Sequence, residues 1–179
     1  MSIAKLPFED MVKKAEQHAL HVSNSCTFPL RFNPSESYKT GGRKFGAPRP
    51  QMGAGILHPA CDLIAPVGTE VLAVDDGVII KGPYDFYLGS YAIEVQHRYF
   101  IVRYGEIKKE QITSPFVKRG QVIAHVSKVG KGSMLHFEMF TGDASGELTQ
   151  KPKPPWNRRK DLMDPTYFLD MWSIGVPSQ

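Results

Sequence analysis

The chain has 179 residues, of which 41% are hydrophobic and 22% are charged, a composition typical of one globular domain with a buried core. The net charge of +4 and the pI near 9.0 favour an anionic partner only weakly. The nearest approach to a basic cluster, KPKPPWNRRK at 151–160, is interrupted by prolines, so a solvated loop is expected there. Because no groove pattern of stacking aromatics with Lys and Arg is found, we expect no nucleic-acid partner.

The first 20 residues carry acidic and lysine side chains through what would be the apolar part of a secretion signal. We therefore expect no Sec signal peptide and no membrane insertion, because no apolar run is long enough to span a bilayer. The protein is expected to be made in the cytoplasm. Its two cysteines, Cys26 and Cys61, allow one disulfide bond, but two free thiols are expected in that compartment.

Residues 8–22 place apolar side chains at the i, i+3, i+4 spacing of an amphipathic helix. His18 and His21 lie three positions apart on it, and we expect them on the solvated face because no third metal ligand is near. Gly and Pro then recur over 28–59, which predicts long loops with room for one strand.

From Ala65 onward the pattern changes to short strands separated by turn signals. Residues 70–82 alternate, with Asp76-Gly77 as the predicted turn of a hairpin. The other predicted strands are two on either side of His97-Arg98, one over 121–128 and one over 134–140. Together they predict a mainly β fold with a compact antiparallel sheet.

The end of the chain is predicted to be a polar, Pro-rich loop followed by one short helix that begins at Asp164-Pro165. The expected organisation has three parts. Residues 1–27 form an N-terminal helical extension, 28–141 form the core, and 142–179 form a loop and helix that pack on it.

His58, Cys61 and Asp62 bring an imidazole, a thiol and a carboxylate into five consecutive positions. Neutral imidazole and carboxylate are normal zinc ligands, and a catalytic zinc keeps three protein ligands and one open position. A cysteine nucleophile with a histidine base and a polar turn without chemistry are the alternatives.

A third ligand is expected from His136. Alternation places Leu135 and Phe137 on one face of a strand and His136 with Glu138 on the other. A histidine that faces away from the core beside a glutamate fits a metal site, and a surface histidine on an edge strand is the other interpretation.

The ordered motifs of this chain resemble those of the lysostaphin-like (LytM-type) zinc metallopeptidases. GILHPACDLIAPVGTEVLAVDDGVI, from 55 to 79, resembles a family motif in which His-x-x-x-Asp precedes Ala-Pro-x-Gly-Thr. VKRGQVIAHV at 117–126 resembles the Val-x-x-Gly-Gln-x-Ile stretch of the family, and LHFEM at 135–139 resembles its Leu-His-Phe-Glu strand. The motifs follow the family order over roughly 28–140.

The resemblance implies a LytM-type fold, a compact antiparallel sheet or hybrid barrel with a groove, in which Zn²⁺ is held by His58, Asp62 and His136. It also implies hydrolysis of peptide cross-links in bacterial peptidoglycan. Such an enzyme has to reach the periplasm or the cell wall, so we expect delivery by a non-Sec route. An immunity protein or a component of a secretion or phage apparatus is then an expected partner.

Two positions depart from the family pattern. Met134 stands where the family has the first histidine of His-x-His, and Glu106 stands where it has the histidine of Tyr-x-His. One interpretation is an inactive module that binds the wall or regulates another wall hydrolase. The other, which we favour, is that Glu106 is the general base of an active enzyme, because a carboxylate can also transfer a proton.

Substrate contacts are expected from Arg49 and Tyr104, and Arg103 is an alternative to Tyr104 for stabilising an oxyanion. Because neighbouring strand residues face opposite sides, at most one of Arg103 and Tyr104 can point at the site. Tyr104 and Glu106 would share a face unless a bulge intervenes at Gly105. Cys61 is expected to pack in the core.

Overall fold

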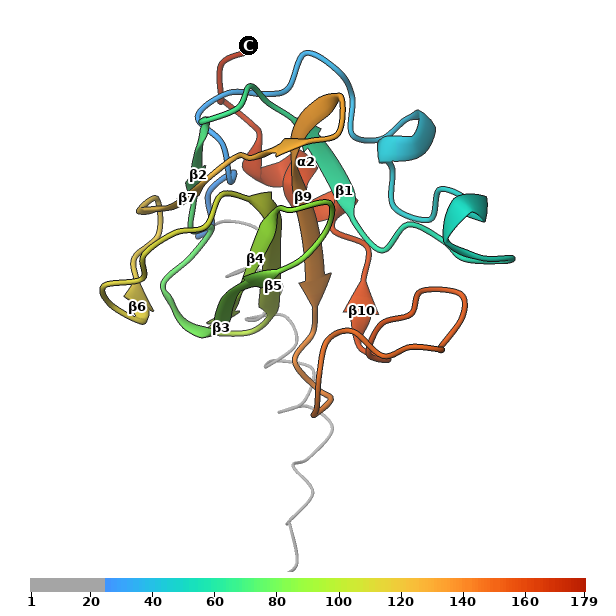
Figure 1. Ribbon diagram of the computed structural model, residues 1–179. Coiled ribbons are helices and arrows are strands. Elements are labelled where there is room, and N and C mark those ends of the chain that lie inside the picture. Colours follow the sequence, from blue (N-terminus) through green and yellow to red (C-terminus); the bar gives the residue numbers. More distant parts are fainter. Residues whose placement is uncertain (1–24) are drawn as a thin grey trace, which may run out of the picture.

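A computed structural model describes residues 25–179 (Figure 1). The helix predicted over 8–22, with His18 and His21, lies outside the described residues. The strands are β1 (Cys61–Ile64), β2 (Glu70–Leu72), β3 (Gly77–Asp85), β4 (Tyr91–His97), β5 (Ile101–Ile107), β6 (Phe116–Val117), β7 (Val122–His125), β8 (Lys128–Val129), β9 (Gly132–Phe140) and β10 (Leu162–Met163). The helical segments are η1 (Gly41–Arg43), η2 (Pro50–Met52) and α2 (Thr166–Trp172).

The main sheet is antiparallel and has the strand order β1-β9-β5-β4-β3-β6. The long strand β9 lies inside it, between β1 and β5 (Figure 1), and also pairs with β8 and β10. The predicted mainly β, antiparallel fold is therefore confirmed. Within the described residues the path ends at β1 and at β6, so the sheet is open and does not close into a barrel.

The hairpin predicted at Asp76-Gly77 is wrong. β2 pairs with β7 in a separate two-stranded sheet, whereas β3 pairs with β4 and β6. The Asp76 carboxylate instead accepts a hydrogen bond from the backbone N–H of Arg119 at 2.9 Å. Alternation identifies a strand from its own residues, but it does not identify the strand with which it pairs.

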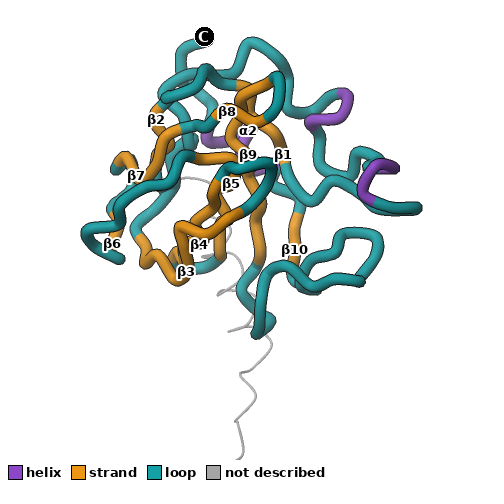
Figure 2. The backbone as a smooth tube through the Cα atoms, in the orientation of Figure 1, coloured by secondary structure: helices purple, strands orange, loops and turns teal. Residues whose placement is uncertain are grey.

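The segment before β1 follows the predicted loop character (Figure 2). Apart from η1 and η2, regular pairing over residues 28–59 is limited to two isolated bridges, Asn33 with Ser178 and Pro48 with Leu57. The second bridge brings the chain back toward the start of β1, which places the loop at the edge of the sheet where β1 lies.

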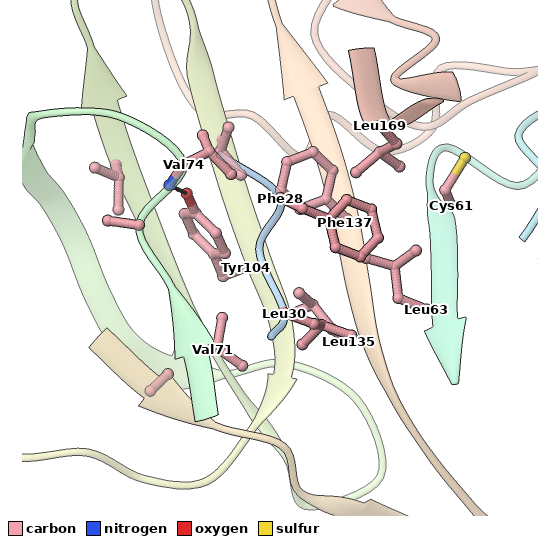
Figure 3. Packing of buried hydrophobic residues seen from close by; sticks show 14 of the residues in the cluster. Phe28, Leu30, Cys61, Leu63, Val71, Val74, Tyr104, Leu135, Phe137 and Leu169 are labelled. Atoms are coloured by element: carbon pink, nitrogen blue, oxygen red, sulfur yellow. Dashed lines mark hydrogen bonds between the residues drawn. The ribbon is translucent and has the colours of Figure 1, made fainter. Parts of the chain in front are cut away.

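The hydrophobic core covers one face of the main sheet (Figure 3). Leu63, Leu135, Phe137 and Tyr104 are fully buried there. The Tyr104 hydroxyl accepts a hydrogen bond from the Val74 backbone N–H at 3.1 Å and also lies 3.2 Å from Nε2 of His97. The core face of β5 is therefore tied to the segment that follows β2.

The helix predicted after Asp164-Pro165 is confirmed as α2. The Asp164 carboxylate accepts a hydrogen bond from the backbone N–H of Thr166 at 2.9 Å, and Leu169 and Trp172 are buried in the core. The Trp172 indole packs against Phe137 with ring centroids 6.3 Å apart. Across residues 25–179, every helix is too short or too polar to cross a membrane.

Replacing Tyr104 by Phe is expected to lower the free energy of unfolding by about 1–2 kcal/mol, because the buried Val74 N–H would lose its acceptor. Denaturant unfolding measures this change. Tyr167→Phe is the control, since Tyr167 is 62% exposed and its change should stay within about 0.5 kcal/mol. Equal values for the two variants would contradict the prediction.

A candidate metal centre in a groove

The register between β1 and β9 places two of the predicted ligands side by side. Asp62 is paired with His136, and Cys61 is paired with Phe137. Because side chains alternate along each strand, Asp62 and His136 face away from the core while Cys61 and Phe137 face into it. Leu135 and Phe137 share the core face as predicted.

Cys61 is thus on the wrong side of the sheet to act as a nucleophile beside His58. It is fully buried, and its Sγ lies 3.4 Å from the Thr166 hydroxyl of α2. Burial raises the pKa of the thiol to about 11, so the reactive thiolate is disfavoured. Cys61 and Cys26 are both free thiols.

His58 is held by the loop that precedes β1. Its backbone N–H donates to Ala47 at 2.8 Å, and its carbonyl accepts from Gly46 at 2.9 Å. On the ring, Nδ1 lies 3.0 Å from the Lys44 carbonyl. Since a carbonyl can only accept, Nδ1 carries the proton, and Nε2 faces Asp62 Oδ1 at 3.2 Å.

His58, Asp62 and His136 offer three ligand atoms that lie within 4.8 Å of one another, and all three residues are buried. Nδ1 of His136 lies 3.0 Å from Oδ1 of Asp62. Two imidazoles and one carboxylate match the donor set of catalytic zinc sites that keep a fourth position open. The predicted ligands therefore converge, and their chemistry fits the metal.

The charges of the centre are strongly coupled. Burial alone would raise the pKa of Asp62, but hydrogen bonds with His136 and His58 outweigh it and hold that pKa well below its usual range. Burial alone would lower the pKa of His136, but its contacts with Asp62 and Glu138 raise it to about 9. The pocket thus favours a negative carboxylate with positive charge beside it.

Glu138 lies behind His136 and is fully buried. Its Oε1 accepts from Nε2 of His136 at 2.9 Å. The Arg103 guanidinium reaches Oε2 at 3.0 Å, and the Arg158 guanidinium reaches Oε1 at 2.7 Å. Although burial opposes ionisation, these two cations together hold the pKa of Glu138 well below its usual range.

Arg103 and Tyr104 do not line the groove, so neither predicted oxyanion contact fits the structure. Arg103 is 1% exposed and is bound to Glu94 at 2.9 Å as well as to Glu138. Tyr104 is in the core on the opposite face, so the predicted substrate contact of Tyr104 is wrong.

Glu106 leaves the strand alternation through a bulge in β5. Gly105 pairs with Ala92 and Ile107 pairs with Tyr91, so Glu106 is an extra residue opposite β4. Its φ of 60° is in the left-handed region, which is rare for a glutamate. The bulge separates Glu106 from the face of Tyr104 and turns its side chain into the groove.

The Glu106 carboxylate has an oxygen, Oε2, that is buried without a hydrogen-bond partner among the described residues. Burial raises its pKa to about 7, with a further rise from Asp62 and a partial offset from His136 and Arg49. A buried, unpaired carboxylate with a pKa near neutrality is suited to proton transfer.

Gly105 makes room for an aromatic ring above the centre. A Cβ at this position would lie 2.7 Å from Cε1 of Phe86. The Phe86 ring packs against His136, with centroids 5.3 Å apart, and lies over the Arg103 guanidinium at 5.8 Å. The glycine therefore lets Phe86 cover one side of the candidate ligand His136.

The centre opens into a groove of about 580 Å³. Arg49 lines it, with Nη2 3.5 Å from Oδ2 of Asp62 and 2.6 Å from the Gly42 carbonyl. Met134 also lines it, at the position where the family carries a histidine. Further lining residues come from η2, from the tip of the β3–β4 hairpin and from the loop after β9, and include Met52, Tyr87, Leu88 and Trp156.

The expectation of a solvated loop at 151–160 is wrong for two of its arginines. Arg158 binds Glu138, and Arg159 binds Asp161 at 2.7 Å, with both arginine side chains largely buried. No local sequence signal identifies the Arg158–Glu138 pair, because the two residues are 20 positions apart. Glu138 itself was expected only to share a face with His136.

This antiparallel β domain thus offers a metal ion three buried ligands, two histidines and one aspartate, beside a groove. The chain belongs to Peptidase family M23, which matches residues 57–148 and so more than half of the chain. The match contains His58, Asp62, Glu106 and His136, and it confirms the resemblance to the lysostaphin-like peptidases.

Two curated proteins are similar in sequence. The peptidoglycan DD-endopeptidase ShyC of Vibrio cholerae is 33% identical over 86 residues, covering 46% of this chain and 20% of that protein. An uncharacterized metalloprotease of Buchnera aphidicola is 28% identical over 139 residues, covering 72% of this chain and 35% of that protein. The chain thus spans about a fifth to a third of the length of these relatives.

Solved structures of lysostaphin from Staphylococcus simulans share the fold. One aligns with a TM-score of 0.61 and 24% identity, covering 84% of this chain and 56% of that one. The catalytic domain alone aligns with a TM-score of 0.53 and 23% identity, covering 71% of this chain and 89% of that one.

Gly105→Ala is expected to lower the free energy of unfolding by about 1–3 kcal/mol, because the new methyl group would displace the Phe86 ring. Thermal or denaturant unfolding measures the change. Gly132→Ala in β9 is the matched control, since its Cβ would meet only the end of Met134 at 3.4 Å. Similar losses in both variants would show that Phe86 is not the reason.

Proposed function

We propose that this protein is a zinc-dependent endopeptidase that cleaves peptide cross-links of bacterial peptidoglycan, with Glu106 as general base. One observation carries the proposal: the buried donor set and a carboxylate without a hydrogen-bond partner line the same groove. The donor set is His58, Asp62 and His136, and the carboxylate is that of Glu106.

His58, Asp62 and His136 would hold the ion through two ring nitrogens and one carboxylate oxygen. A zinc ion bound there would lower the pKa of a water molecule and would polarise a peptide carbonyl. The low pKa of Asp62 keeps the carboxylate ionised for this role, and the Lys44 carbonyl fixes which ring nitrogen of His58 faces the site.

Glu106 would take the proton from the attacking water and later deliver it to the leaving amine. Its pKa near 7 suits both transfers, because the group is ionised often enough to accept a proton and gives it up readily. Because no described residue donates to Oε2, no hydrogen bond stabilises the ionised form of Glu106 at that oxygen, which agrees with the raised pKa.

Arg49 would bind the substrate from the other side of Asp62. Its guanidinium is anchored by the Gly42 carbonyl and lines the groove, and it can donate to a peptide carbonyl or carboxylate. The apolar rim formed by Met52 and Leu88, which are 47% and 66% exposed, offers contact surface to an extended peptide.

The substrate class is supported by membership of family M23 and by the similarity to a protein named as a peptidoglycan DD-endopeptidase. Action in the periplasm or on the cell wall follows from this substrate. An immunity protein or a secretion or phage component as partner stays a prediction.

A second candidate function, favoured by Met134, is an inactive module that binds the wall or regulates another hydrolase. The thioether lines the groove where a hydrogen-bond donor would stabilise developing charge, and it can neither donate nor carry a proton. This candidate predicts binding of sacculi without release of peptides.

The protein is expected to bind one zinc ion. Asp62→Ala is expected to weaken this binding by more than about 100-fold, because the loss of a group that only orients a ligand already lowers metal affinity by about 10–100-fold. Competition with a chromophoric chelator measures the affinity. The control is Asp143→Ala, which removes an exposed carboxylate. Zinc binding equal in wild type and Asp62→Ala would rule out this centre.

Glu106→Gln is expected to lower cleavage of purified sacculi by about 10²–10⁴-fold while zinc stays bound, because the amide cannot accept the proton. Released peptides are quantified by chromatography. Glu110→Gln is the matched control four positions away, where Glu110 pairs with His125 outside the groove.

The pH profile of the wild type adds a second check on Glu106. The rate should fall as the pH drops through about 7 or somewhat below, because protonated Glu106 cannot act as a base. The charge of a bound ion, like the nearby His136 and Arg49, shifts this inflection downward, whereas Asp62 shifts it upward.

Full cleavage by Glu106→Gln would remove Glu106 from the mechanism. Binding of sacculi without cleavage by the wild type would support the inactive module.

A further inference from the structure

We propose that Arg158, which lies beyond the family-matched region, is a positioning residue that completes the metal centre by fixing Glu138 and, through it, the ring of His136. The inference rests on the proposed function, since it assumes that His136 binds zinc.

The contacts form a continuous chain from Arg158 to the candidate ligands. Arg158 donates from Nη2 to Oε1 of Glu138 at 2.7 Å and from Nε to Oε2 at 2.9 Å. Oε1 accepts from Nε2 of His136 at 2.9 Å, and Nδ1 of His136 lies 3.0 Å from Asp62. Each member of this chain is buried or nearly so.

The carboxylate determines which nitrogen of His136 is free. An ionised carboxylate can only accept, so a hydrogen bond to Glu138 keeps the proton on Nε2 and leaves the lone pair of Nδ1 for a metal. A carboxylate behind a ligating histidine also fixes the ring orientation and raises the basicity of the ligand. Movement of Glu138 would therefore weaken its hold on both the protonation and the orientation of the His136 ring.

Arg103 cannot supply this restraint alone. It reaches Oε2 of Glu138 at 3.0 Å and divides its guanidinium between Glu138 and Glu94. Arg158 binds Oε1, the oxygen that faces His136, and bridges both oxygens of the carboxylate. The planar fork of an arginine matches a carboxylate in this way, whereas a point charge does not.

The backbone around Arg158 is itself held in place. Residue 158 forms a bridge with Thr149, and the Gln150 backbone N–H donates to the Asn157 carbonyl at 3.1 Å. The family match ends at residue 148, so this loop lies beyond the matched region. In Figure 1 it is the orange to red loop between the end of β9 and β10.

Arg158→Gln is expected to weaken zinc binding by about 10–100-fold, measured on the full chain by competition with a chromophoric chelator. The matched control is Arg159→Gln. Arg159 is the next residue, is similarly buried and binds the carboxylate of Asp161 through Nε and Nη2, yet it touches no candidate ligand.

Both variants should unfold more easily than the wild type, because each leaves a buried carboxylate with fewer partners. Only Arg158→Gln should lose zinc affinity, while Arg159→Gln should stay within about twofold of wild type. Equal losses in the two variants, or none in Arg158→Gln, would overturn the inference.

Arg158→Lys keeps the protein testable if Arg158→Gln does not fold. Lysine retains the charge but cannot bridge both oxygens, so we expect an affinity between those of wild type and Arg158→Gln. In the zinc-loaded wild type the Nε2–H proton of His136 should give a slowly exchanging NMR signal, and this signal should broaden in Arg158→Lys. An unchanged affinity and signal in Arg158→Lys would count against the proposal.

Zinc binding by the wild type distinguishes failure of the proposed function from failure of the role of Arg158. Absence of zinc binding by the wild type would overturn the proposed function together with this inference. Zinc binding by the wild type that Arg158→Gln retains in full would overturn only the role of Arg158.

Discussion

The pairing of β1 with β9 is the constraint on which the rest of the site depends. It places Asp62 opposite His136 on one face and Cys61 opposite Phe137 on the other. A slip of one residue would send the carboxylate into the core and the thiol into the groove, so burial of the core face enforces the register. The same hydrophobic packing that stabilises the fold therefore aligns the candidate ligands.

Behind the ligands, the sheet buries charges that would be costly if unpaired. Glu94 and Glu138 are matched by Arg103 and Arg158, and Tyr84 adds a hydrogen bond to Glu94 at 2.7 Å. Removing one member of such a set is destabilising because its partner stays buried and charged. We infer that this network restrains the His136 ring, because both oxygens of the Glu138 carboxylate are already hydrogen-bonded to arginines.

The departures from the family pattern take different structural forms. Glu106 reaches the groove because a bulge and a left-handed backbone take it out of the strand alternation. Met134 needs no such device, since it follows the regular register of β9 opposite Ile64. A strained conformation of the kind adopted by Glu106 is often retained for function, which agrees with a role as base, whereas Met134 offers only an apolar contact.

The sequence by itself determined the features that depend on neighbouring residues. These are the presence of several short strands, the helix after Asp164-Pro165 and the motif residues His58, Asp62 and His136, because alternation, capping and spacing are local patterns. Only the tertiary structure decided the partner of β2, the burial of Tyr104, the bulge at Glu106 and the contact of Arg158 with Glu138. Each of these depends on which distant segments pack together, and strand pairing and buried charge pairs leave no periodic trace in the sequence.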